Sequence, residues 1–194
     1  MIPTRLRCTA FAGHHRIASG ELRHVAMKAK QAHDADPAQP VRVFDDASGR
    51  QVEVPLELPA AELLRQLSQP GLPQPRRAPA RRGPGRPRLG VVAREVTLLP
   101  EHWEWLAAQP GGASVALRAL VDAARRVSAG DDARRAAQEA GYRFLQAMGG
   151  DLPGCEEALR ALFAGDFRRF EDGIAAWPDD IRDHAALLAA AAFP

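Results

Sequence analysis

Residues 68–90 limit the fold of this chain most strongly, because their composition suits neither a helix nor a strand. They contain six of the sixteen prolines, four glycines and six arginines, with no acidic residue. Proline fixes φ and lacks a backbone donor, and like charges along the segment repel one another. We therefore expect an extended, mobile linker between folded regions at residues 1–67 and 91–194.

The remaining composition is that of a folded α+β protein. A hydrophobic content of 46% over 194 residues is enough to build a core. The net charge is only +2, so the local arginine cluster is better evidence for an anionic partner than the total charge. Lys28 and Lys30 are the only lysines, beside 24 arginines, a bias that a GC-rich genome produces without a functional cause.

Cysteine usage and hydropathy indicate the cellular compartment. Cys8 and Cys155 fit no metal or redox spacing, which favours two buried thiols in a reducing cytoplasm. The N-terminus lacks the apolar run of a signal peptide, and no apolar stretch reaches membrane-spanning length. We expect a cytoplasmic protein with no membrane partner.

The first region, residues 1–67, predicts a small ββαββα domain. Alternating segments at 7–12 and 15–18 are separated by Gly13, which indicates a hairpin. Residues 21–32 have helical apolar spacing. A second hairpin is expected from strands 41–44 and 51–54 around a turn rich in Asp and Gly, followed by a helix at 60–67 that starts after Pro59.

The region 91–128 predicts one strand followed by two helices. Residues 94–99 indicate a strand that ends at Pro100, and helical patterns at 101–109 and 114–127 are split by the sequence Pro-Gly-Gly at 110–112. On the first helix we expect Trp103, Leu106 and Ala107 in the core, with Trp105 turned toward the N-terminal domain. On the second we expect an apolar face of Leu117, Leu120, Val121 and Ala124.

This strand–helix–helix pattern resembles a ribbon-helix-helix DNA-binding module. The resemblance implies a homodimer in which strand 93–99 pairs with its copy and fits the major groove. Arg94 and Thr97 then contact base edges, and Ser114 at the second helix N-terminus meets a phosphate. The adjacent Leu98 and Leu99, and Glu95 facing phosphates, depart from the family pattern. The alternative is a strand and helix pair packed inside a larger α+β fold.

The linker itself contains a sequence that resembles an AT-hook in part. Residues 82–88 read Arg-Gly-Pro-Gly-Arg-Pro-Arg, which is similar to the Gly-Arg-Pro core with flanking basic residues, except for Pro84. Such a segment inserts arginine into the narrow, negative A·T minor groove. The alternative is a solvated linker that assists through phosphate contacts. The candidate DNA-binding residues here are Arg76, Arg77, Arg81, Arg82, Arg86 and Arg88.

Residues 129–194 predict a helical region of three or four helices. Interruptions fall at 149–153, 165–166 and 177–179, and the acidic helices have apolar faces that suit self-packing or, alternatively, a partner that shields the arginines. Adjacent histidines at 14–15 point to opposite strand faces, Asp45 and Asp46 suit a turn, and Asp179 and Asp180 suit a helix cap. No clustered catalytic, metal or cofactor pattern is present, so we expect neither an enzyme nor a cofactor.

Over nearly its full length the chain resembles a bacterial family, domain-of-unknown-function family 2239. The resemblance is carried by residues 9–13, 43–46, 85–87, 89–100, 102–103, 109–114 and 150–154. The resemblance implies a class of bacterial protein, but it implies no particular activity and leaves the mechanism open. We therefore expect a DNA-binding homodimer, either a transcriptional regulator or a nucleoid-associated protein. The alternative is a non-catalytic interaction or scaffold protein whose basic linker joins two partner-binding domains.

Overall fold

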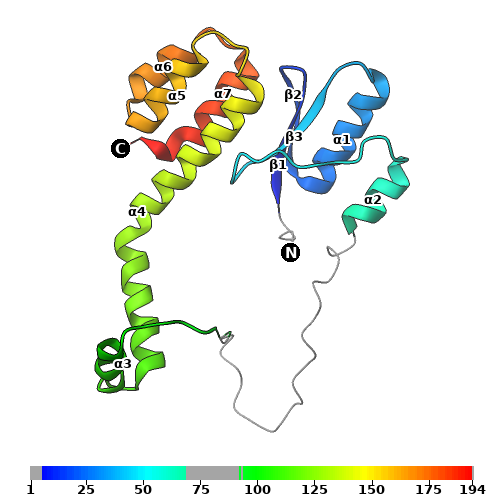
Figure 1. The fold of residues 1–194 in the computed structure, drawn as a ribbon. Helices are drawn as coiled ribbons and strands as arrows, with labels where there is room; N and C mark the ends of the chain where they lie inside the picture. Colours follow the sequence, from blue (N-terminus) through cyan, green and yellow to red (C-terminus); the bar gives the residue numbers. More distant parts are fainter. Residues whose placement is uncertain (1–5, 69–91, 93, 194) are drawn as a thin grey trace. The chain divides into compact units, whose positions relative to one another are not determined.

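A computed structural model describes residues 6–68, 92 and 94–193 (Figure 1). The chain separates into two compact units. The two-segment unit consists of the described residues of 1–72 together with 131–193, and the central module consists of the described residues of 73–130.

A three-stranded antiparallel sheet forms the first part of the two-segment unit. Its strands are β1 (Arg7–Ala12), β2 (His15–Glu21) and β3 (Val41–Asp45), in the order β2-β1-β3. Gly13 makes the β1–β2 turn with φ of 56°, a left-handed conformation that favours glycine. Helix α1 (Leu22–Ala35) packs on all three strands, and its Val25 and Ala29 are fully buried. The predicted first hairpin, first helix and third strand are confirmed.

The predicted fourth strand is wrong. After the 45–50 turn the chain makes one isolated bridge, between Phe44 and Gln51, and then leaves the sheet. Pro55 comes soon afterwards and has no N–H to donate, which explains why a longer ladder does not form. Helix α2 (Ala60–Ser68) then begins after Pro59, as expected.

Four helical segments form the second part of the same unit. They are the C-terminal half of α4 (Ala113–Met148), α5 (Cys155–Ala164), α6 (Phe167–Ile174) and α7 (Asp179–Ala189), with the short 3₁₀ helix η1 (Ala190–Ala192) at the end. Their shared core is apolar and includes Leu145, Leu162 and Ile181, each fully buried. The predicted interruptions and the self-packing of the acidic helices are therefore confirmed.

Both faces of the sheet are covered. Cys8, Ala10 and Val43 face α1, whereas Phe11 and Phe44 pack on Phe144 of α4 with ring centroids 5.6 and 5.0 Å away. Burial of these rings joins the N-terminal sheet and the C-terminal helices into one core.

Polar contacts fix the same junction at its rim. The Arg42 guanidinium donates to the carbonyl of Ala147, and Arg143 Nη1 donates to the carbonyl of Ser48 at 2.9 Å. Gly49 has φ of 64°, and a Cβ there would lie 2.8 Å from the Ala140 carbonyl carbon. The 45–50 turn therefore lies directly against α4 and has no room for a side chain at Gly49.

The central module contains α3 (Pro100–Ala107) and the N-terminal half of α4. The intervening turn has positive φ at Gly111 and Gly112 (81° and 74°), so the predicted Pro-Gly-Gly break is confirmed. The predicted end of the second helix near Val127 is wrong, because α4 continues without interruption to Met148. No described helix combines the length and the apolar character needed to cross a bilayer.

Residues 94–99 form no strand within a single chain. The predicted strand is therefore wrong for one copy of the protein. The segment enters α3 through Leu99, whose backbone is extended (φ −67°, ψ 153°), and Pro100 occupies the first turn. A lone strand has no partner for its backbone hydrogen bonds, so pairing through strand 93–99 stays a prediction about a second copy.

Candidate nucleic-acid interface

The nine residues expected to contact DNA divide into two groups. Six of them, Arg76, Arg77, Arg81, Arg82, Arg86 and Arg88, lie outside the described residues. The other three, Arg94, Thr97 and Ser114, belong to the central module, where all three are exposed. Arg94 and Thr97 lie in the segment before α3, and Ser114 lies in the first turn of α4. The structure thus shows that solvent reaches all three side chains.

The N-terminus of α4 has free backbone donors. The amides of Val115 and Ala116 both donate to the Gly112 carbonyl at 3.1 Å. Within the described part of the chain, no group accepts a hydrogen bond from the amides of Ala113 and Ser114. Unpaired N–H groups and the helix dipole favour an anion at such an end.

Helix α3 buries little of its surface in the described module. Leu106 is its one buried residue, with 3% exposed, and Gln109 Nε2 donates to the Trp105 carbonyl at 3.1 Å just beyond the helix end. The predicted core positions Trp103, Leu120 and Val121 are 41%, 48% and 55% exposed, so this part of the core prediction is wrong for a single copy.

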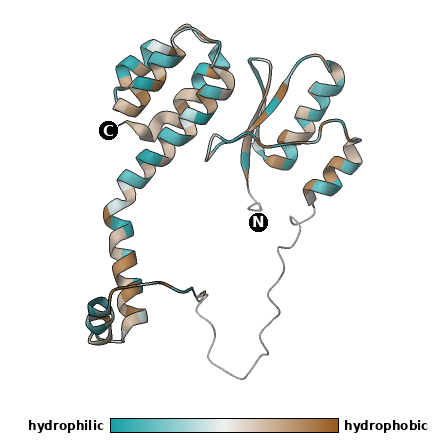
Figure 2. Cartoon of the chain, in the orientation of Figure 1, coloured by the Kyte–Doolittle hydropathy of each residue, from teal (hydrophilic) through white to brown (hydrophobic). Residues whose placement is uncertain are grey.

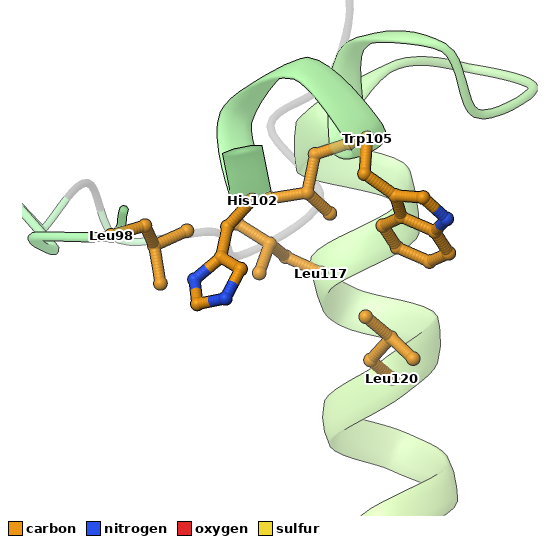
Figure 3. A pocket seen from close by; sticks show the side chains of 6 residues that line it. Leu98, His102, Trp105, Leu117 and Leu120 are labelled. Carbon is orange, nitrogen blue, oxygen red and sulfur yellow. The ribbon is translucent and has the colours of Figure 1, made fainter. Parts of the chain in front are cut away.

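The packing of α3 on α4 leaves an apolar hollow of about 270 Å³ (Figure 3). Its lining residues come from the segment before α3 and from both helices: Leu98, His102, Trp105, Leu106, Leu117 and Leu120. Trp105, which was expected to turn toward the N-terminal domain, lines this hollow of the module. Sequence reasoning missed the hollow because it assigned Trp103, and not Trp105, to the apolar side of α3.

The charges of the described module balance. Arginines at positions 94, 118, 125 and 126 are matched by acids at 95, 101, 104 and 122. Since non-specific DNA affinity comes from neutralised phosphates, the module alone has no net charge to supply it. The described module therefore has no excess of positive charge from which such affinity could come.

The two-segment unit contains a buried polar group that sequence reasoning missed. His184 is 1% exposed, lies between the rings of Phe11 and Phe144, and no described residue bonds to its Nε2. Burial lowers the pKa of His184, nearby Asp46 opposes that shift, and Arg16 adds to it. His184 is therefore part of the buried contact between β1, α4 and α7.

Other titratable groups of this unit also have structural explanations. Asp45 accepts from the Ala47 amide at 3.2 Å and from the Ser48 hydroxyl, which is the expected turn chemistry. Asp180 lies in the first turn of α7, where Pro178 is the N-cap, and its Oδ2 accepts from the Arg16 amide at 2.9 Å. Asp179 and Asp180 thus both lie in the first turn, the end of a helix that carboxylates favour, and Asp180 also links α7 to β2.

Both cysteine side chains are buried thiols. Cys8 and Cys155 are free and buried, as predicted. Burial, assisted by the charges of Asp45 and Asp46, raises the pKa of the Cys8 thiol to about 12. Within the described residues there is no group of three or more His, Cys, Asp or Glu side chains that could hold a metal ion.

Comparison with known proteins gives one finding. No curated protein and no solved structure matches the chain. One family model does match, over residues 7–189, and its description is "uncharacterized protein conserved in bacteria" (DUF2239). Because the match spans both the two-segment unit and the central module, the chain belongs to the bacterial DUF2239 family.

Proposed function

We propose that this protein is a non-catalytic, double-stranded DNA-binding protein that acts as a homodimer, in transcription regulation or in nucleoid organisation. The observation that supports it best is the order of features along the chain. Six arginines without an acid at 76–88 directly precede a module whose Arg94, Thr97 and Ser114 are all accessible.

Each group has its own physical task in this proposal. The six arginines neutralise phosphates, and Arg86 and Arg88, in the AT-hook-like sequence, enter an A·T minor groove. Two copies of segment 93–99 pair as a ribbon in the major groove, where Arg94 and Thr97 meet base edges. The free amides beside Ser114 bind a backbone phosphate.

Because the charges of the described module balance, the salt dependence of DNA affinity can be predicted from the arm alone. If only the arm neutralises phosphates, six contacts give a slope of log affinity against log salt of about −5 per arm, from about 0.9 for each phosphate. Replacing three of the arm's arginines should then reduce the magnitude of that slope by about 3.

Fluorescence anisotropy with labelled duplexes tests this over a range of salt concentrations. The variant carries Arg82→Gln, Arg86→Gln and Arg88→Gln. The matched control carries Arg160→Gln, Arg168→Gln and Arg169→Gln, three exposed positions on α5 and α6 that remove the same charge. We expect a flatter slope and lost A·T preference in the first variant alone. Equal slopes in the two variants, or no duplex binding at low salt, would overturn the proposal.

A second function is favoured by a different observation. The central module is charge-balanced and exposes apolar side chains, including Trp105 at 52%. These features also suit a protein-interaction or scaffold protein whose basic linker has no nucleic-acid partner. A folded protein that binds no duplex at low ionic strength would favour this alternative.

A further inference from the structure

The N-terminal half of α4 has one face without charge. Leu117, Leu120, Ala124 and Val127 recur at spacings of three, four and three residues, which places them along one side of the helix. Alanines at 116 and 123 flank this row. The charged residues of the same stretch, at 118, 122, 125 and 126, lie off it. We call this row, together with Val121 beside it, the α4 stripe (residues 117, 120, 121, 124 and 127).

The α4 stripe is exposed within one copy. Leu120, Val121 and Val127 are 48%, 55% and 86% exposed. In Figure 2, brown marks hydrophobic residues along the N-terminal half of α4. At one end the stripe continues into the apolar hollow, because Leu117 and Leu120 belong to both (Figure 3). At the other end Asp131 ends the apolar row.

We infer that a second copy of this chain covers the α4 stripe and the hollow beside it. This inference rests on the two-chain module proposed above and extends it from the 93–99 ribbon to a helix–helix contact. The interface it assigns therefore has two parts, a strand pair and a packed pair of α4 helices.

The absence of charge on the face favours an identical partner. Two copies of a charged face would repel each other wherever like charges meet, whereas two copies of this stripe meet without that penalty. The spacing of three and four residues is also the one that lets two helices interlock their side chains.

The area of the face supports the same occupant. Half-exposed side chains of Trp105, Leu120 and Val121, with Val127 and the flanking alanines, present roughly 500 Å² of apolar surface. A standard interface takes about 800 Å² from each partner. The face thus supplies more than half of a stable interface, and the ribbon pair would supply the remainder.

A small-molecule ligand fits the hollow less well. Ligand pockets are usually larger, from about 300 Å³ upward, and place several polar groups to orient their ligand. Here His102 is the one strongly polar side chain among the six lining residues, and the volume is about 270 Å³. An apolar side chain from a second copy fits these dimensions and this chemistry.

Sedimentation velocity of the full chain without DNA tests the inference, with the variants Leu120→Glu and Val127→Glu. Both side chains are exposed in one copy, Val127 at 86%, so neither change should unfold a monomer. The control is Ala129→Glu, an exposed position of α4 on the side away from the stripe. We expect a dimer for the wild type and control, and a dissociation constant raised at least 100-fold in both stripe variants.

Three results would overturn the inference. They are a monomeric wild type at tens of micromolar, dimers that persist in both stripe variants, and equal weakening by Ala129→Glu. None of these depends on duplex binding, which the arm variants report separately. A dimer that fails to bind DNA would refute the proposed function and leave this interface standing.

Discussion

Replacing Gly49 by alanine should loosen the junction between the sheet and α4. The residue has φ of 64°, and an added Cβ would lie 2.8 Å from the Ala140 carbonyl carbon and 2.9 Å from its Cα. Both atoms belong to the backbone of a packed helix, so they cannot rotate away. Either the 45–50 turn or the helix must shift.

Gly165 provides the matched control. It has φ of 70°, close to that of Gly49, but an added Cβ there would meet nothing within 4 Å. Alanine at Gly165 therefore costs only the left-handed conformation, about 1–2 kcal/mol, partly offset by about 0.4–1 kcal/mol of lost unfolded-state freedom. Alanine at Gly49 adds an overpacking cost of about 1–3 kcal/mol. The difference between the two variants isolates the contact with α4.

Urea unfolding monitored by tryptophan fluorescence measures this difference. Trp177 is 3% exposed and lies in the C-terminal helices, so a Trp103→Phe, Trp105→Phe background leaves it as the only fluorescent tryptophan. We expect Gly49→Ala to lower the free energy of unfolding at Trp177 by about 1–3 kcal/mol more than Gly165→Ala does. Equal losses in the two variants would refute the reasoning that the sheet and the C-terminal helices share one core.

Three further outcomes are expected from the same unit. Phe144→Ala should cost about 3–5 kcal/mol in urea unfolding, against under about 1 kcal/mol for the exposed control Phe163→Ala; similar losses would contradict the shared core. Because burial lowers the pKa of His184, the unfolded state takes up a proton first. Stability should therefore fall as pH drops below about 6.5, and His184→Phe should flatten that fall; an unchanged pH profile would count against it. With its pKa raised to about 12, Cys8 should resist a thiol reagent at pH 8 until urea unfolds the chain, and rapid labelling of the folded protein would disprove its burial.

The local interruptions of the chain could be predicted from the sequence. Gly13 and the Pro110-Gly111-Gly112 turn were expected from their composition, and all three glycines have positive φ. Such breaks depend on the backbone freedom of one or two residues, so neighbouring sequence is sufficient to locate them. The helices of residues 155–189 could be predicted in the same way from the interruptions between them.

Element lengths were less predictable. The segment 51–54 alternates like a strand but keeps only the bridge at Gln51, because Pro55 next to it cannot donate to a ladder. The helix expected to end near Val127 runs on to Met148. Gly130 within it costs only about 1 kcal/mol relative to alanine, which packing of the later turns outweighs.

The sequence contains an indication that a distant segment packs on the N-terminal sheet. The strand 8–12 is buried at every position, so both of its faces are covered. An antiparallel strand with one solvated face alternates polar and apolar residues, and Phe11 stands where a polar residue would then be expected. That pattern indicates a second layer, but it cannot name Phe144 and His184 as the residues that supply it.

For the candidate interface, sequence reasoning named three accessible residues of the module but missed the hollow. Arg94, Thr97 and Ser114 can be reached from solvent, as DNA contacts require. The orientation of Trp105 depends on how α3 lies on α4, and a helical wheel of an eight-residue helix does not determine it. The arginines at 76–88 lie outside the described residues, and their role stays a prediction.

The mass of the protein–DNA complex is the most direct test of DNA binding by a homodimer. Sedimentation of the full chain with a short A·T-rich duplex at low ionic strength gives the number of chains bound to each duplex. We expect two chains on one duplex, in a complex that dissociates steeply as the salt concentration is raised. A single bound chain, or free duplex at every salt concentration, would contradict it.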